Sequence, residues 1–122
     1  MSVYAPNYFP ANQLSFTAGA DITGGQVVYI SAANTVSPTS AATIGWVGVA
    51  AHDAKSGTQV VVYTEGVHTV AASGSIAAGA NVVGASSGAV ADQSTPTAAN
   101  DPQVIGLALT AAASNLVTIL IR

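Results

Sequence analysis

Short runs of β-branched residues, each closed by turn-forming residues, recur along the whole sequence. Val, Ile and Thr favour extended backbone, whereas Gly, Asn, Ser and Pro favour turns. No stretch combines helical periodicity with helix caps. The runs are QVVYIS, TIGWVGVA, TQVVVYT, VHTVAA, ANVVGAS, QVIGLAL and LVTILI. This pattern predicts an all-β protein, a small single-domain barrel or sandwich.

Two parts of the sequence resemble each other, which indicates an internal duplication. DITGGQVVYIS resembles SIAAGANVVGAS, and TIGWVGVA resembles VIGLALTA. The matching positions are Ile22 with Ile76, Gly25 with Gly79, Val28 with Val82, and Ile44-Gly45 with Ile105-Gly106. We therefore expect the barrel or sandwich to be built from two similar β units.

Two turn-forming pairs predict how neighbouring runs are connected. Glu65-Gly66 divides TQVVVYTEGVHTVAAS, and Gly66 can take the positive φ of a tight hairpin turn. Ser114-Asn115 divides the uncharged stretch from Gln103 to Ile121, which is nearly long enough to span a bilayer. This pair favours two strands joined by a turn over a membrane helix, so no membrane partner is expected.

The first sixteen residues, MSVYAPNYFPANQLSF, hold four of the seven aromatic side chains and no charge. Proline fixes its own φ and biases the preceding residue toward extended backbone. We expect an extended N-terminal arm over residues 1–16 and a β body over residues 17–122. Aromatic side chains are typical interface anchors, so the arm is predicted to bind a partner molecule or a neighbouring subunit. Its contact residues would be Tyr4, Pro6, Tyr8, Phe9, Pro10, Leu14 and Phe16. The alternative is that the arm packs as a lid over its own barrel.

Few residues carry the chemistry of an enzyme or a metal site. His52, Asp53 and Lys55 lie together in AHDAKSG, but this segment is typical of a polar turn between strands. The other carboxylates also fall in or beside turns, and two histidines without cysteine make a poor metal-ligand set. The sequence has no nucleophile elbow and no phosphate-binding loop. We expect no catalysis, no metal and no cofactor.

Charge is scarce, with two basic and five acidic residues and a net charge of −3. Nucleic-acid binding needs several clustered cations, so no nucleic-acid partner is expected. A chain with so little charge is poorly protected against association, which favours a protein that works in an assembly. The single tryptophan, Trp46, lies in a glycine-flanked run and is predicted to be a core or interface anchor.

The order of these elements resembles the small head-decoration, or capsid cement, proteins of tailed bacteriophages, in particular the DUF2190-type proteins. The resemblance covers nearly the whole chain beyond the arm. The residues that carry it are Ile22, Gly25, Val27 and Val28; Gly48 to Ala50; Gly57 to Val67; Ile76 and Gly79; Ile105, Gly106 and Ala108; and Val117 and Ile119.

The resemblance implies a structural virion protein, made in the host cytoplasm, that binds the outside of a phage capsid and stabilises it. Its implied partners are the major capsid protein and further copies of itself, commonly as a trimer at three-fold or quasi-three-fold positions. The alternative function is a β-sandwich module on a virion or cell surface that binds a receptor or a glycan.

Overall fold

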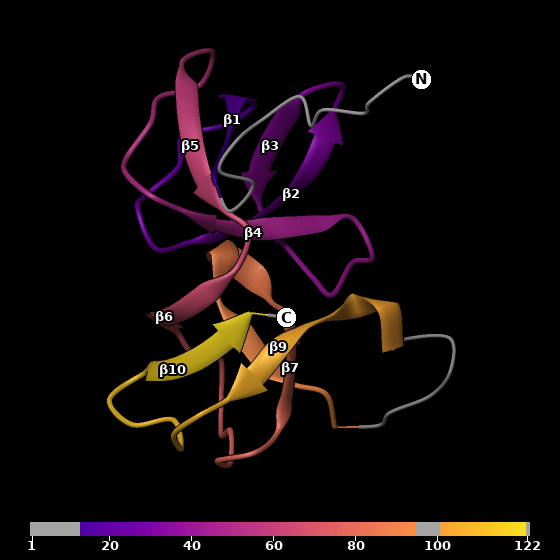
Figure 1. Ribbon diagram of the computed structural model, residues 1–122, viewed down its shortest axis with the longest axis vertical. Coiled ribbons are helices and arrows are strands. Elements are labelled where there is room, and N and C mark those ends of the chain that lie inside the picture. Colours follow the sequence, from indigo (N-terminus) through magenta and orange to yellow (C-terminus); the bar gives the residue numbers. More distant parts are fainter. Residues whose placement is uncertain (1–12, 95–100, 122) are drawn as a thin grey trace, which may run out of the picture.

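The computed structural model describes residues 13–94 and 101–121, and within these ranges the chain is all-β, as predicted (Figure 1). The strands are β1 (Gln13–Ala18), β2 (Val27–Ala32), β3 (Thr35–Pro38), β4 (Trp46–Ala50), β5 (Gln59–Tyr63), β6 (Gly66–Ala71), β7 (Asn81–Gly84), β8 (Val90–Asp92), β9 (Val104–Ala108) and β10 (Leu116–Ile121). Two short 3-10 helices accompany them, η1 (Ser86–Gly88) and η2 (Asp101–Gln103). The predicted runs omit β1, β3 and β8.

The strands form two five-stranded units with the same neighbour order. In the first unit, β1-β3-β2-β4-β5 closes into a barrel, in which β1 pairs with β5 antiparallel and with β3 parallel. In the second unit the order is β6-β10-β9-β7-β8, and a parallel bridge between Ala72 and Val90 joins its two ends. Strands β6 to β10 therefore repeat β1 to β5 in both order and direction.

The strand registers confirm the duplication at its first matched segment. Val28 lies opposite Gly48 in the first unit, and Val82 lies opposite Gly106 in the second. The preceding turns also agree. The Gly25 N–H donates to the carbonyl of Ala50 in β4, and the Gly79 N–H donates to the carbonyl of Ala108 in β9, both at 2.8 Å.

The predicted match of Ile44-Gly45 with Ile105-Gly106 is wrong, because the counterpart of Gly106 is Gly48. At both glycines the neighbouring strand passes so close that a β carbon would collide with a backbone carbonyl, that of Tyr63 or Leu120. IGWVGVA contains two glycines, Gly45 and Gly48, and only the close approach of β5 to β4 at Gly48 distinguishes them.

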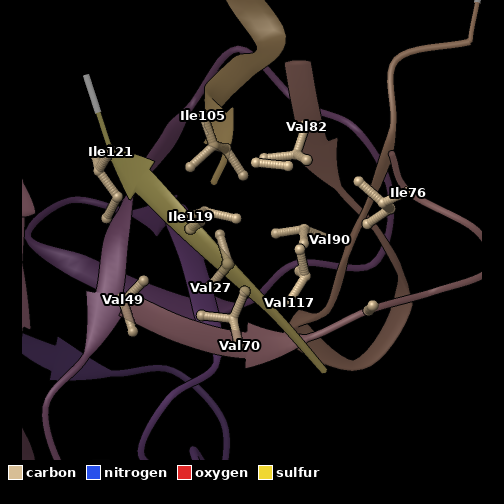
Figure 2. Close-up of a cluster of buried hydrophobic side chains, with 12 residues drawn as sticks. Val27, Val49, Val70, Ile76, Val82, Val90, Ile105, Val117, Ile119 and Ile121 are labelled. Atoms are coloured by element: carbon tan, nitrogen blue, oxygen red, sulfur yellow. The ribbon is translucent and has the colours of Figure 1, made fainter. Parts of the chain in front are cut away.

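Buried aliphatic side chains form one cluster in each unit. The first cluster contains Ala18, Ile22, Val28, Val36, Ala50, Val60 and Val62. Their counterparts Ala72, Ile76, Val82, Val90, Ala108, Val117 and Ile119 belong to the second cluster, much of which Figure 2 shows. That second cluster also contains Val27 and Val49, which come from β2 and β4 of the first unit. The two units therefore share a core, and separating them would expose apolar surface to water.

The predicted hairpin around Glu65-Gly66 is wrong. Strand β5 pairs with β1 and β4, whereas β6 pairs with β10. Gly66 does take a positive φ, of 109°, but it redirects the chain from the first unit into the second. Both sides of β5 already have partners in the first unit, so β6 cannot add to it.

The predicted pair of strands at the C-terminal end is confirmed, because β9 and β10 pair antiparallel on either side of Ser114-Asn115. Both turn residues have positive φ, 53° and 61°. Within the described part of the chain, no helix has the length and apolar character to cross a membrane.

Candidate interaction surfaces

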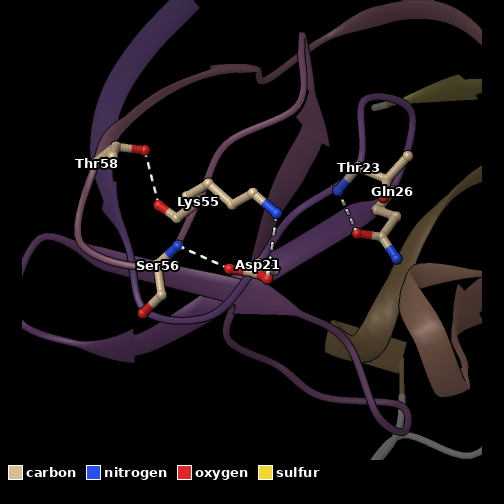
Figure 3. Close-up of polar contacts among 6 residues, drawn as sticks. All are labelled: Asp21, Thr23, Gln26, Lys55, Ser56 and Thr58. Carbon is tan, nitrogen blue, oxygen red and sulfur yellow. Dashed lines mark hydrogen bonds and ion pairs between the residues drawn. The ribbon is translucent and has the colours of Figure 1, made fainter.

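The segment His52–Lys55 takes part in hydrogen bonds and an ion pair that connect two loops of the first unit. Asp53 Oδ1 accepts a hydrogen bond from Gly24 N at 2.8 Å, and Asp21 Oδ1 accepts one from Ser56 N at 3.0 Å. Lys55 Nζ lies 3.8 Å from Asp21 Oδ2 (Figure 3), but both side chains are exposed, so this ion pair contributes little to stability. These loops line a surface cavity of about 350 Å³.

The histidine rings also make local contacts. His52 Nε2 accepts a hydrogen bond from Val61 N at 3.2 Å, so its Nδ1 carries the proton that is donated to Asp53 O at 2.8 Å. His68 stacks on Tyr63 with ring centroids 5.5 Å apart, at the connection between the units. Among residues 13–94 and 101–121, no three His, Cys, Asp or Glu side chains are grouped so that they could hold a metal ion.

The predicted arm overlaps the first strand. Leu14 and Phe16 lie in β1, where they pair with Val62 and Val60 of β5. Phe16 packs against the first core cluster. Residues 13–16 therefore belong to the barrel, and the segment before the body is shorter than the sequence predicts. The other predicted arm residues, Tyr4, Pro6, Tyr8, Phe9 and Pro10, lie outside the described residues.

Trp46 lies at the contact between the two units. It is half-buried at the start of β4, packs against the second core cluster, and donates from Nε1 to Pro102 O at 3.3 Å. Further hydrogen bonds join the first unit to the η1 segment: Thr39 Oγ1 to Ala85 O at 2.9 Å, Gly88 N to Thr39 O at 3.0 Å, and Gln26 Nε2 to Ser87 O at 3.0 Å. Trp46 and these hydrogen bonds together hold one unit against the other.

We expect Trp46→Ala to lower the free energy of unfolding by about 2 kcal/mol, less than for a fully buried tryptophan. The loss reflects packing against the second core cluster and the hydrogen bond to Pro102. Urea denaturation measures the change, and Trp46→Phe is the control, because it keeps most of the apolar contact. Equal stability of the alanine variant and the wild type would contradict the anchoring role.

One apolar surface is not predicted by the sequence. It is the side of β6, β10 and β9 that faces away from the core, here called the second-sheet outer face. Its side chains are Val67, Thr69, Ala71, Leu107, Leu109, Leu116, Thr118 and Leu120. The residues of LVTILI alternate between the core side and the outer side of the sheet. Both sides are largely apolar, so the sequence pattern does not identify which side is exposed.

Comparisons with known proteins agree with the fold. Residues 9–122 match the family model described as phage cement protein. A solved structure, the crystal structure of the head fiber gp8.5 N base in bacteriophage phi29, has a TM-score of 0.67 and 24% sequence identity. The alignment covers 90% of this chain and 92% of that one. No curated protein sequence matches the chain.

Proposed function

Because the chain belongs to the phage cement protein family, we propose that it binds the outer surface of a phage capsid and stabilises the shell as a decoration protein. The family match over residues 9–122 carries the proposal, since it spans the whole described body. Membership makes the chain a structural protein associated with a phage capsid. We propose no catalytic role and no cofactor for it.

The proposed partners are the major capsid protein and further copies of this chain, as a trimer at three-fold or quasi-three-fold positions of the shell. The low charge supports self-association, because seven charged side chains on 122 residues leave much of the surface without electrostatic repulsion. In this proposal the protein is made in the host cytoplasm and joins the exterior of the capsid. Closed rings of identical subunits are the common form of such assemblies.

The proposed capsid contact is the N-terminal segment, with Tyr4, Tyr8 and Phe9 as its anchors. The segment is uncharged, and it precedes β1, which begins at Gln13. Aromatic side chains bury a large area at a small cost in conformational entropy, which is why interface hot spots favour them. Twelve extended residues can reach about 40 Å, enough to cross onto a neighbouring subunit.

Deleting Ser2 to Asn12 is expected to weaken capsid binding at least about 10-fold, as the loss of a hot-spot segment does. The deletion begins and ends outside β1, so the body should keep its fold and its far-UV circular dichroism spectrum. Co-sedimentation with expanded capsids that lack this protein measures the affinity.

A full-length variant, Tyr8→Ser/Phe9→Ser, is the matched control for chain length and should lose affinity to a similar degree. Unchanged affinity of both variants would contradict the role of the segment. If the wild-type protein does not co-sediment with capsids but binds a glycan array, the receptor- or glycan-binding alternative would replace the decoration function.

A further inference from the structure

The end of the ladder between β4 and β5 is completed by a side chain instead of a strand. Just after β4, which ends at Ala50, Ala51 N still donates to Val61 O at 2.8 Å. The next donor along this edge of β5, Val61 N, is bonded to Nε2 of the His52 ring at 3.2 Å. A backbone N–H beyond the end of its partner strand needs another acceptor. His52 supplies that acceptor and connects the loop after β4 to β5.

The second unit completes the equivalent position with a side chain that does not titrate. The equivalent donor is Thr118 N of β10, which is bonded to Thr110 Oγ1 at 3.3 Å. Thr118 O accepts from Leu109 N at 2.8 Å. Leu109 and Thr110 follow β9 as Ala51 and His52 follow β4. The fold therefore places a side-chain acceptor here in both units, and the imidazole of the first unit is an acceptor only while it is neutral.

The hydrogen bonds of His52 require the neutral ring in one tautomer. Nδ1 lies 2.8 Å from the carbonyl oxygen of Asp53, which can only accept, so Nδ1 carries a proton. Nε2 accepts from Val61 N and therefore keeps its lone pair. A second proton, bound at Nε2, would place two N–H groups opposite each other and remove the bond to Val61.

The surroundings of the ring allow it to bind that proton. His52 is exposed to water, and imidazole is the side chain that ordinarily changes charge between about pH 5 and pH 8. Among the described residues, the charged groups of the segments around it are Asp53 and Lys55 on its own loop and Asp21 on the facing loop. Strands β1 and β5 add no charged residue, and β5 adds the titratable Tyr63. Two carboxylates and one ammonium do not oppose a cationic ring.

We propose that His52 is a pH-sensitive contact that holds the loop after β4 against β5 at neutral pH and releases it on acidification. The proton comes from solvent and binds Nε2, and Val61 N then loses its acceptor. The contact therefore adds to stability at neutral pH and is lost as the pH falls. The released loop carries Asp53 and Lys55, so the surface around the cavity of about 350 Å³ is expected to rearrange with it. This contact works in the same way whether or not the protein binds a capsid.

Amide hydrogen exchange of the isotope-labelled chain, measured by NMR and corrected for the intrinsic rate at each pH, tests the proposal. We expect the protection of Val61 N–H to fall about 5-fold between about pH 7.5 and about pH 5, the factor that one hydrogen bond contributes. Thr118 N–H, bonded to a hydroxyl, should keep its protection over the same range. The variant His52→Thr gives the first unit the acceptor of the second. Its Val61 protection should change by less than about 2-fold.

His68→Gln is the matched control, because His68 Nε2 lies 3.1 Å from Glu65 O, a carbonyl to which a protonated ring can still donate. It should leave the pH dependence at Val61 unchanged, and circular dichroism checks that both variants are folded. The nitrogen chemical shifts of the His52 ring need no variant, and at about pH 7.5 they should show a proton on Nδ1 and none on Nε2. A proton on Nε2 at that pH would overturn the proposal. The same pH dependence of Val61 protection in His52→Thr as in the wild type would also overturn it.

Discussion

Replacing Gly48 or Gly106 by alanine is expected to lower the free energy of unfolding by about 3 kcal/mol or more. A β carbon at Gly48 would collide with the carbonyl oxygen of Tyr63, and one at Gly106 with that of Leu120. Both obstacles are backbone atoms of a neighbouring strand, so they cannot rotate away as a side-chain tip can. The strands would have to separate, at the expense of packing in the close-packed core. Urea denaturation of each variant measures the loss.

Gly45→Ala is the matched control, because the nearest atom to its β carbon would be Thr43 Oγ1 at 3.7 Å. We expect its stability to stay within about 0.5 kcal/mol of the wild type. The comparison also tests the repeat, since sequence similarity pairs Gly45 with Gly106 and the structure pairs Gly48 with it. Similar losses for Gly45→Ala and Gly48→Ala would be evidence against the close crossing of β4 and β5.

Val27→Asn is expected to cost about 3 kcal/mol, because it places an amide in an apolar environment without a partner. Val27 lies opposite Val49, and both side chains are buried between the units. The reciprocal change, Asn81→Val, is made at the equivalent position of the second unit, where the side chain is exposed. We expect that change to alter the stability by no more than about 0.5 kcal/mol.

Urea denaturation monitored by Trp46 fluorescence measures both changes, since Trp46 lies at the contact between the units. The two variants exchange residues between equivalent positions of one fold, so β-strand propensity alone predicts small effects of opposite sign. A loss of no more than about 0.5 kcal/mol for Val27→Asn would show that the second unit does not bury Val27.

Local sequence patterns predicted the secondary structure where turn residues divide β-branched runs. Ser114-Asn115 illustrates this, because its two residues take positive φ between β9 and β10 as a tight connection requires. The pair Glu65-Gly66 carries an equally strong signal, but the strands beside it belong to different sheets. A turn signal reports the local backbone, whereas the partners of a strand depend on residues far away in the sequence.

The candidate contact residues also differ in this way: local sequence predicts their type of environment, and the tertiary structure decides their packing partners. Phe16 belongs with the aromatic arm by composition, yet it pairs with Val60 and packs against the first core cluster. Trp46 was expected in the core or at an interface, and the structure places it at the contact between two units of a single chain. Neither position could be inferred from neighbouring residues, because both depend on which surface of one unit meets the other.

The sequence by itself determined the all-β class, the repeat of two β units and the resemblance to cement proteins. Each of these follows from alternation, turn residues or similarity over a few neighbouring positions. Only the tertiary structure decided that each unit forms its own five-stranded sheet and that Val49 is buried while its counterpart Leu107 remains on the outside. The reason is physical: burial depends on what packs against a side chain, and the packing partner is contributed by a distant part of the chain.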